Sequence, residues 1–147
     1  MAVTIYTDGG CRGNPGPSSA GVWVPTLNIR AGYYLGPSKT NNEAEYSALI
    51  LAFVTAKEYG WDELALFCDS KLMVEQMKGC YAVKSETLRP LYERASELEA
   101  NFKTTTYTHV KRALNAEADA ICNKVLDDVE AGNAWGVYEP LRGGINT

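Results

Sequence analysis

The stretch NNEAEYSALILAFVTAKEYGWDELALFCD, residues 41–69, changes its pattern partway along. Its first twenty residues have the composition of a helix that opens at an Asn cap and closes at Gly60. Apolar residues occupy more than one face of that helix, which predicts that it is largely buried. Residues 63–69 form a short apolar run, typical of a strand, that ends in an aspartate. A buried helix followed by a strand indicates an α/β protein with helices packed on a sheet.

Three short runs rich in β-branched and aromatic residues precede this stretch, namely VTIYTD (3–8), AGVWVP (20–25) and RAGYYLG (30–36). Gly or Pro turns bound each run. Consecutive runs with tight connections are typical of an antiparallel meander, so we expect the sheet to start as three antiparallel strands.

Downstream, the pattern returns to helices and one further strand. SKLMVEQMKG (70–79) has a Ser cap and a closing Gly, and TTTYTHV (104–110) is a β-branched strand. Residues 85–102 and 115–132 carry apolar residues at helical spacing, and Pro90 marks the expected start of the regular part of the first of these helices. The order β-β-β-α-β-α-α-β-α predicts a mixed sheet flanked by helices, because a helix between strands usually makes a crossover to a parallel neighbour.

A chain of 147 residues forms about one domain. We expect a domain at residues 1–132 and a tail at 133–147, which lacks periodicity and is anchored by Trp135 and Tyr138. The start MAVTIYTD does not resemble a signal peptide, and the longest nearly apolar run is too short to span a membrane. We therefore expect a cytoplasmic protein without membrane contact, and a monomer.

The charge balance limits how the protein can hold an anionic partner. The net charge is −4 and the sequence pI is about 5.0, which argues against a broad electrostatic grip on nucleic acid. Any such contact must rely on a local patch or on bound cations. The four cysteines are scattered without zinc spacing, so we expect reduced thiols.

Four acidic residues occupy unusual positions. Asp8 and Asp69 each end a predicted strand, and Glu45 and Asp119 lie in the first and last predicted helices. At about 100° per residue, Glu45 shares a face with apolar side chains, whereas Glu43 points the opposite way. A carboxylate at the end of a buried stripe needs a cation or a basic side chain beside it. A single Asp at a strand end is more often a turn or cap residue, and spacing alone does not bring the four together.

A hard divalent cation, which takes oxygen ligands, would satisfy such a set. Two cations about 3.5–4 Å apart can hold an in-line phosphoryl displacement, with one activating a water and the other stabilising the leaving oxygen. A metal-dependent hydrolase of phosphate esters is therefore one function that these residues suggest.

Four segments resemble, in order and spacing, the four sequence blocks of type 1 ribonuclease H: YTDGGCRGNPGPSSAGVW (6–23), TNNEAEYSALILAF (40–53), CDSKLMVEQM (68–77) and HVKRALNAEADAICNKV (109–125). The resemblance implies a five-stranded mixed sheet with flanking helices. It implies endonucleolytic cleavage of the RNA strand of RNA/DNA hybrids, with 5′-phosphate and 3′-hydroxyl products. It also implies two Mg²⁺ ions, or Mn²⁺, held by an Asp-Glu-Asp-Asp set.

By this resemblance the catalytic, metal-binding carboxylates are Asp8, Glu45, Asp69 and Asp119. Asp8 would bridge both metals, Asp119 would join it at the water-activating metal, and Glu45 and Asp69 would lie at the leaving-group metal. The residues at family positions that contact the hybrid in its minor groove, where the RNA 2′-hydroxyls are displayed, are Asn14, Asn41 and Asn42. The backbone amides expected to add further substrate contacts are those of Gly9, Gly10 and Cys11.

The sequence departs from many family members before the last aspartate. Those members carry a loop histidine there, whereas the segment VKRALNAEAD has none. His109 precedes it, and we interpret His109 as a structural residue of a strand. Arg112 is nearest to the missing position, as in short archaeal-like members. It could meet a phosphate as a cation, or it could be a solvated loop residue.

A second departure is the missing basic protrusion that some members use to grip the DNA strand. Only KGCYAVKSETLRP lies between Met77 and Leu91. The basic residues that could form a smaller phosphate patch, or could simply be solvated, are Lys71, Lys78, Lys84 and Arg89. This composition predicts weak substrate binding with strong salt dependence.

Other functions stay open at this point. They are a non-catalytic module that binds hybrids or double-stranded RNA, a junction resolvase, and the nuclease domain of a reverse transcriptase. Double-stranded RNA is a further possible substrate. The loop GGCRGNPGP lacks the Lys-Ser/Thr ending of a P-loop and leads into a strand, so we interpret its glycines as letting a nucleic-acid backbone approach Asp8.

Overall fold

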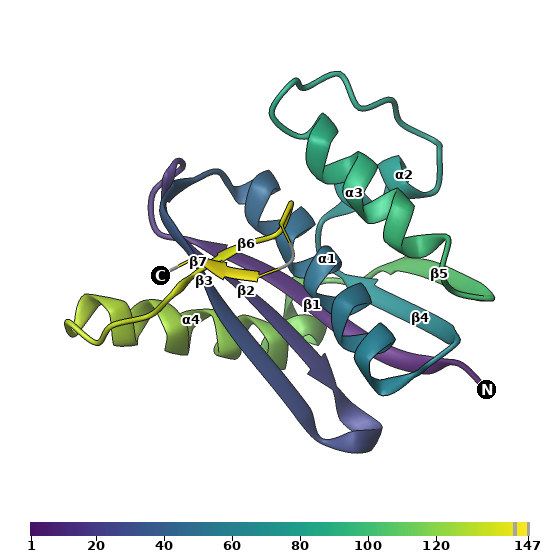
Figure 1. The fold of residues 1–147 in the computed structure, drawn as a ribbon, viewed down its shortest axis with the longest axis horizontal. Helices are drawn as coiled ribbons and strands as arrows, with labels where there is room; N and C mark the ends of the chain where they lie inside the picture. The colour runs from purple at the N-terminus through teal and green to yellow at the C-terminus, as the bar shows by residue number, and fades with distance from the viewer. Residues whose placement is uncertain (143, 147) are drawn as a thin grey trace.

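The computed structural model describes residues 1–142 and 144–146. A seven-stranded sheet in the order β5-β4-β1-β2-β3-β6-β7 carries the helices (Figure 1). The strands are β1 (Val3–Cys11), β2 (Gly16–Val24), β3 (Ile29–Lys39), β4 (Glu63–Cys68), β5 (Thr104–His109), β6 (Val137–Glu139) and β7 (Gly144–Asn146). The helices are α1 (Asn41–Tyr59), α2 (Lys71–Met77), α3 (Arg89–Glu99) and α4 (Ala116–Glu130), with short 3₁₀ turns η1 (Pro25–Leu27) and η2 (Arg112–Asn115).

The five predicted strands are all present and their pairing is mixed. β2 pairs antiparallel with both β1 and β3, which confirms the meander. β4 pairs parallel with β1 and with β5, as the crossover helices require. The expectation of only five strands was too low, because the tail adds β6 and β7 at the β3 edge. Strands of three residues are too short to show a repeating hydrophobic pattern in sequence.

Helix α1 is almost wholly buried, as expected from its apolar residues. Its N-cap is Thr40 and not an asparagine. The Thr40 hydroxyl accepts from the Glu43 amide, and the Glu43 carboxylate accepts from the Thr40 amide, so a capping box closes the helix start. Gly60 ends the helix with φ of 75°, a left-handed conformation that suits glycine.

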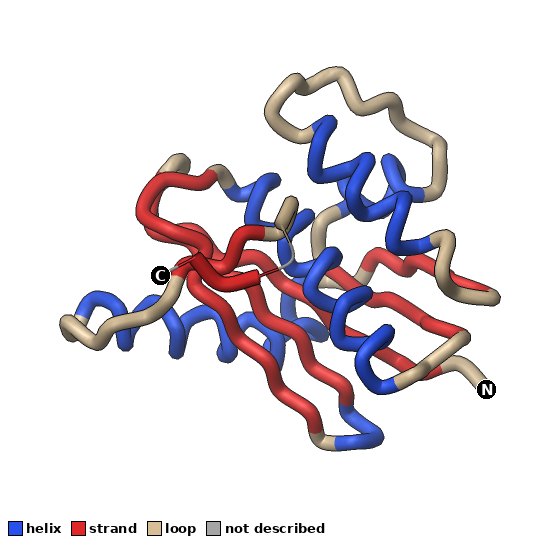
Figure 2. Tube along the Cα trace, viewed as in Figure 1, coloured by secondary structure: helices blue, strands red, loops and turns tan. Residues whose placement is uncertain are grey.

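Helices α1 and α4 cover opposite faces of the sheet (Figures 1 and 2). Two adjacent glycines of β1 show why the helices can pack so closely. A Cβ on Gly9 would lie 2.4 Å from the Ala44 carbonyl carbon of α1, and one on Gly10 would lie 2.9 Å from the Cys122 Cβ of α4. Successive strand residues face opposite sides, so each glycine admits one helix. Gly9 and Gly10 therefore serve helix packing. The interpretation of the loop glycines as a surface for nucleic acid stays a prediction.

Part of the tail is anchored on the sheet. Tyr34 of β3 pairs in parallel with Val137, and the Tyr138 side chain is only 4% exposed with its ring 5.1 Å from that of Tyr33. Trp135 is 37% exposed and contributes less. The predicted tail also includes residues 143 and 147, which lie outside the described residues.

Two further observations concern the cysteines and the possibility of a membrane-spanning helix. All four cysteines are free thiols, as expected. No helix among residues 1–142 and 144–146 has the length and hydropathy needed to cross a membrane.

Candidate active site

The fold brings three of the predicted carboxylates together. Each of Asp8, Glu45 and Asp69 offers a carboxylate oxygen, and these oxygens all lie within 4.8 Å of one another. We call these three residues the carboxylate cluster. β1 and β4 are parallel neighbours with Thr7 opposite Cys68, so the residues that follow meet at one edge of the sheet. Glu45 joins them from the second turn of α1, which crosses β1 at the Gly9 contact.

Burial raises the pKa values of two carboxylates of the carboxylate cluster. Asp8 is 5% exposed and Glu45 is 8% exposed. Burial, the charge of Asp69 and the neighbouring Asp119 carboxyl together raise the pKa of Asp8 to about 8. The pKa of Glu45 is also raised, first by burial and then by the charges of Asp8 and Asp69. Like charges held this close in low dielectric call for a compensating cation.

The backbone of β1 fixes the position of Glu45. The Gly9 amide donates a hydrogen bond to Glu45 Oε1. This donor is therefore occupied, and the predicted substrate contact by the Gly9 amide has no free N–H to use. The Gly10 position faces Cys122 of α4, and the Cys11 thiol donates to the carbonyls of Gly13 and Lys39.

Asp119 approaches the carboxylate cluster from the first turn of α4. Its carboxyl lies within hydrogen-bonding reach of Asp8 and helps to raise the pKa of Asp8. Asn123 Nδ2, one helical turn further on, donates to Asp119 Oδ2 at 3.2 Å. Asp119 thus lies next to Asp8, at the side of the three carboxylates whose oxygens are mutually close.

The two candidate basic groups lie in different environments. Arg112 is exposed on η2, and its positive charge lowers the pKa of Asp8, opposing the burial effect. Arg112 is therefore close enough to the carboxylate cluster to act on it electrostatically. His109 is exposed at the end of β5, opposite Cys68.

Asn115 is a site residue that the sequence analysis did not single out. It is 1% exposed, and its Nδ2 donates to the Thr7 carbonyl at 2.9 Å and to Asp69 Oδ2 at 3.4 Å. Its side chain thereby ties η2 both to β1 and to the carboxylate cluster. The signal was present in NAEAD, where an asparagine precedes Asp119 by four residues, but an asparagine near a helix start normally indicates only a cap.

A groove of about 560 Å³ opens at the start of α1, the helix that carries Glu45. It lies between the start of α1 and the segment that joins α2 to α3. The predicted substrate residues that line it are Asn14 and Asn42, and the other polar or basic side chains in its wall are Thr40, Gln76, Lys84, Ser85 and Thr87. The Asn41 amide donates to Asn14 Oδ1 at 3.0 Å, so the loop after β1 and the start of α1 form one continuous rim.

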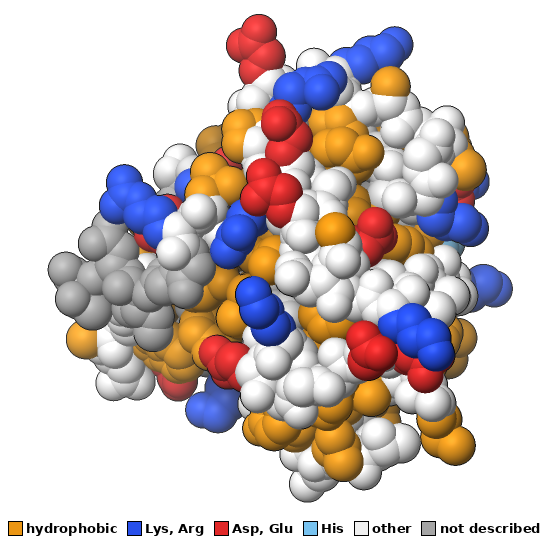
Figure 3. All heavy atoms as spheres, turned by 45° about the vertical axis from the view of Figure 1, so that its right-hand side comes forward, with side chains coloured by type: hydrophobic (Ala, Val, Ile, Leu, Met, Phe, Trp, Pro, Cys, Tyr) orange, Lys and Arg blue, Asp and Glu red, His pale blue; other side chains and the backbone are white. Residues whose placement is uncertain are grey.

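Most members of the predicted basic patch are not part of this groove. Lys84 lines it, whereas Lys71 is exposed at the start of α2 and Arg89 donates to the Val83 carbonyl at 2.5 Å. On the face drawn in Figure 3, basic and acidic side chains are interspersed. Any grip on a polyanion in this groove must therefore use polar side chains, one lysine and bound cations.

The donor set suits a hard divalent cation. Three carboxylates with mutually close oxygens, two of them buried and with raised pKa values, match the oxygen ligands that Mg²⁺ and Mn²⁺ prefer. The buried thiols nearby are poor competitors, because burial raises the pKa of Cys68 to about 12 and also raises that of Cys122.

Comparison with known proteins agrees with this geometry. A protein family described as reverse transcriptase-like matches residues 6–125. The crystal structure of RNase H1 from Halobacterium salinarum superposes with a TM-score of 0.82 at 39% identity, covering 87% of this chain and 99% of that one. The chain belongs to the ribonuclease H family.

Other members of the ribonuclease H family are similarly close. Ribonuclease HI of Halobacterium salinarum is 41% identical over 131 residues, which is 86% of this chain and 65% of that protein. LC11-RNase H1, solved in complex with an RNA/DNA hybrid, gives a TM-score of 0.81 at 34% identity over 87% of this chain and 99% of its own. The chain spans 65% of the Halobacterium relative and 36% of a bifunctional Mycobacterium tuberculosis relative.

Proposed function

We propose that this ribonuclease H-family protein is an endonuclease that cleaves the RNA strand of RNA/DNA hybrids with Mg²⁺ as cofactor. The observation that carries the proposal is the convergence of Asp8, Glu45 and Asp69, with Asp119 next to Asp8. A family member of similar fold was solved with a bound RNA/DNA hybrid, which supports the substrate class.

The four carboxylates would hold two divalent ions. Bound there, such ions would provide an activated water and stabilisation of the leaving oxygen of the RNA strand, for products with a 5′-phosphate and a 3′-hydroxyl. Mn²⁺ has similar ligand preferences and is the expected substitute. The protein's part is to hold the carboxylates in place. The Gly9 amide does this for Glu45, and the Asn115 amide does it for Asp69.

The polar groove would position the duplex. Asn14 and Asn42 line it and Asn41 is bonded to Asn14, so the three predicted minor-groove residues share one rim. Amide side chains can both donate to and accept from a 2′-hydroxyl, the group that distinguishes RNA from DNA. Lys84, on the opposite wall, is placed to meet a phosphate of the second strand.

Arg112 would add a cation beside the carboxylate cluster. Its charge already acts on Asp8, and a guanidinium binds phosphate oxygens well. A guanidinium cannot shuttle protons near neutral pH, so we assign Arg112 to phosphate binding and not to general acid catalysis. Lys71 remains a candidate for a further phosphate contact.

A binding module without catalysis fits the site less well. Such a module gains nothing from holding buried like charges together, and this arrangement is costly without cations. Monomeric state, cytoplasmic location and activity on double-stranded RNA remain predictions.

Matched duplexes of one sequence, as RNA/DNA, RNA/RNA and DNA/DNA, test the proposal. Purified protein is incubated with each, in Mg²⁺, in Mn²⁺ and in EDTA, and the products are resolved at single-nucleotide length. We expect internal cleavage of the RNA in the hybrid, no cleavage in EDTA and no cleavage of DNA/DNA. Equal cutting of DNA/DNA would instead indicate a resolvase-like nuclease, and no cutting of any duplex would favour a binding module.

A further inference from the structure

The outward side of α4 carries a row of polar residues that starts at the active site. Asp119, Asn123, Asp127 and Glu130 follow one another at offsets of 4, 8 and 11 residues, which places them on one helix face. The first of these residues reaches Asp8, and the last two lie at the far end of the helix. This face therefore links the carboxylates to a region about two turns away.

Arg12, from the loop after β1, lies along this face. Its Nη2 donates to Asp127 Oδ1 at 2.7 Å, to Asn123 Oδ1 at 3.2 Å and to the Asn123 carbonyl at 3.4 Å. Its Nη1 forms an ion pair with Glu130 at 2.8 Å. With two carboxylates and an amide around it, the guanidinium is held in a defined place although its side chain remains 29% exposed.

This contact decides the orientation of the Asn123 amide. A guanidinium has only donors, so it must face the amide oxygen. The amide nitrogen then points the other way, where Nδ2 donates to Asp119 Oδ2 at 3.2 Å and to the Asp119 carbonyl at 3.2 Å. Without Arg12, the amide could turn over and present its oxygen to the carboxylate, which would repel it.

We propose that Arg12 and Asn123 are positioning residues for Asp119: Arg12 orients the Asn123 amide, and this amide holds the Asp119 carboxylate toward Asp8. The same contacts join the loop after β1 to α4. They thereby fix the position of Asp119, on α4, relative to Asp8, on β1. Partners of metal-binding carboxylates commonly influence metal affinity through such hydrogen bonds.

In this proposal, Arg12 does not contact the substrate. Arg12 lies in GGCRGNPGP, the loop of the predicted nucleic-acid contacts, and a free arginine there would be expected to meet a phosphate. Its charge is instead matched by Asp127 and Glu130. Replacing Arg12 should therefore alter the metal site and leave hybrid binding unchanged.

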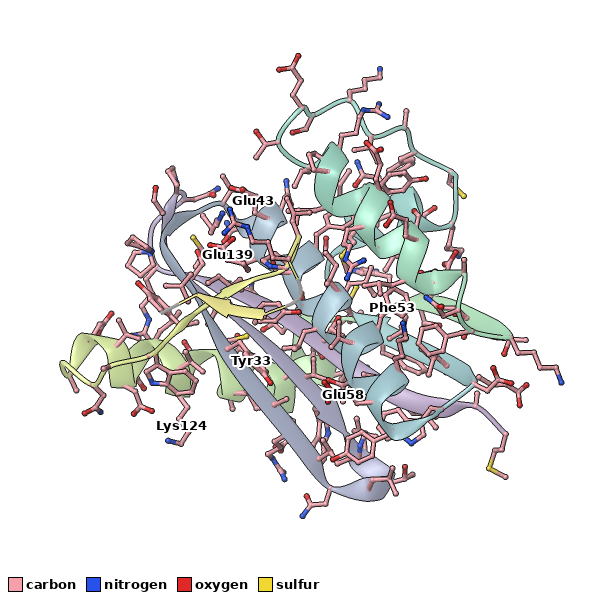
Figure 4. The ribbon with its side chains drawn as sticks, viewed as in Figure 1. Tyr33, Glu43, Phe53, Glu58, Lys124 and Glu139 are labelled. Carbon is pink, nitrogen blue, oxygen red and sulfur yellow. The ribbon has the colours of Figure 1, made fainter. Side chains whose placement is uncertain are left out.

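The test uses the variants Asn123→Ala, Arg12→Ala and the double variant, with Lys124→Ala as control. Lys124 neighbours Asn123 in sequence, pairs with Asp128 at 3.5 Å, and points away from the body of the protein (Figure 4). It is therefore a surface ion-pair residue of the same helix without a contact to Asp119. Circular dichroism of each variant confirms that it is folded.

Calorimetric titration with MgCl₂ and with MnCl₂, in the absence of nucleic acid, measures metal affinity directly. We expect about a 10-fold loss in Asn123→Ala, the lower end of the range for residues that support metal ligands. The loss in Arg12→Ala should be smaller, because Asn123 keeps its own bond to Asp119. The double variant should bind no more weakly than Asn123→Ala, and Lys124→Ala should match wild type. Unchanged metal affinity in Asn123→Ala would overturn the inference.

A hybrid-cleavage assay gives the second readout. This part of the test rests on the proposed function. At limiting Mg²⁺ we expect a lower kcat in Asn123→Ala and Arg12→Ala, recovery at high Mg²⁺, and an unchanged KM for the hybrid. A raised KM in Arg12→Ala with unchanged Mg²⁺ dependence would make Arg12 a phosphate contact and overturn its positioning role. If wild type cleaves no hybrid, the proposed function fails, while the calorimetric comparison still decides the inference.

Discussion

Asp8 is a buried carboxylate whose surroundings favour its protonated form when no cation is bound. It is 5% exposed, and burial followed by the charge of Asp69 raises its pKa to about 8. The folded protein therefore binds a proton at Asp8 more tightly than the unfolded chain does. The stability from this group is present below the unfolded pKa of about 4 and is lost as the pH rises through 8.

The variant Asp8→Asn should therefore stabilise the protein when no metal is present. In EDTA at pH 8.5 we expect its Tm to exceed that of wild type by about 3–8 °C, the shift that 1–2 kcal/mol produces in a domain of this size. At pH 5 the difference should shrink. Thermal melts followed by circular dichroism measure both values, and Glu86→Gln, which removes an exposed carboxylate, should show neither effect. A lower Tm for Asp8→Asn at pH 8.5 would contradict the account.

Asn115 offers a second test at the same scale. Its amide bonds the Thr7 carbonyl at 2.9 Å and Asp69 Oδ2 at 3.4 Å while it is 1% exposed. Asn115→Ala should lower the free energy of unfolding by about 1–3 kcal/mol, because a buried carbonyl loses its partner. Urea denaturation measures this loss. Asn115→Asp should be at least as destabilising above pH 6, since it sets a further carboxylate beside Asp69.

Residue-level reasoning from sequence was most useful where a periodicity applied. The helical angle separated Glu45 from Glu43, and the structure places Glu45 in the carboxylate cluster and Glu43 in the capping box. It could not identify Asn115 or Asn123, because their importance comes from contacts with residues distant in the chain or from the orientation of an amide. The orientation of a side-chain amide produces no periodic pattern in the sequence.

At the scale of elements, the main strands and helices of the first 132 residues were predictable because each carries a local signal: apolar composition, hydrophobic spacing, β-branching or a capping residue. α3 begins at Arg89 with Pro90 in its first turn, one residue from the expected start. The cap of α1 was predicted to be an asparagine but is Thr40, because both residue types cap helices and they are adjacent here. The packing role of the β1 glycines could not be predicted, because only the tertiary structure shows that α1 and α4 approach there.

The tail strand β6 yields a prediction about stability. Tyr138 is 4% exposed beside Tyr33, and among the described residues its hydroxyl has no hydrogen-bond partner. Tyr138→Ala should lower the free energy of unfolding by about 3 kcal/mol, as expected for removing a buried aromatic ring. Tyr138→Phe should leave stability unchanged or raised, because it removes only an unbonded polar group. Chemical denaturation of both variants decides the point, and equal losses would show that the hydroxyl matters.

At the scale of the whole molecule, the net charge of −4 must be reconciled with a polyanionic substrate. The groove offers one lysine, and the exposed basic residues are mixed with acidic ones. Few phosphate contacts and long-range repulsion predict a weak complex. Each phosphate contact that forms releases bound counterions, so affinity should fall as monovalent salt rises. A salt titration of hybrid binding should give a clearly negative slope, made shallower in Lys84→Ala. A slope near zero would refute this prediction.

In the proposed function, Asp8 holds the divalent ions with which this protein cleaves RNA in a hybrid. The most direct test of this claim is a single-turnover cleavage assay of one labelled hybrid in Mg²⁺, comparing wild type with Asp8→Asn, two proteins that should both be folded. We predict that wild type cleaves the RNA strand and that Asp8→Asn is slower by at least about 1000-fold, in line with the loss of a principal electrostatic group. Cleavage by Asp8→Asn at a rate near that of wild type would contradict the claim.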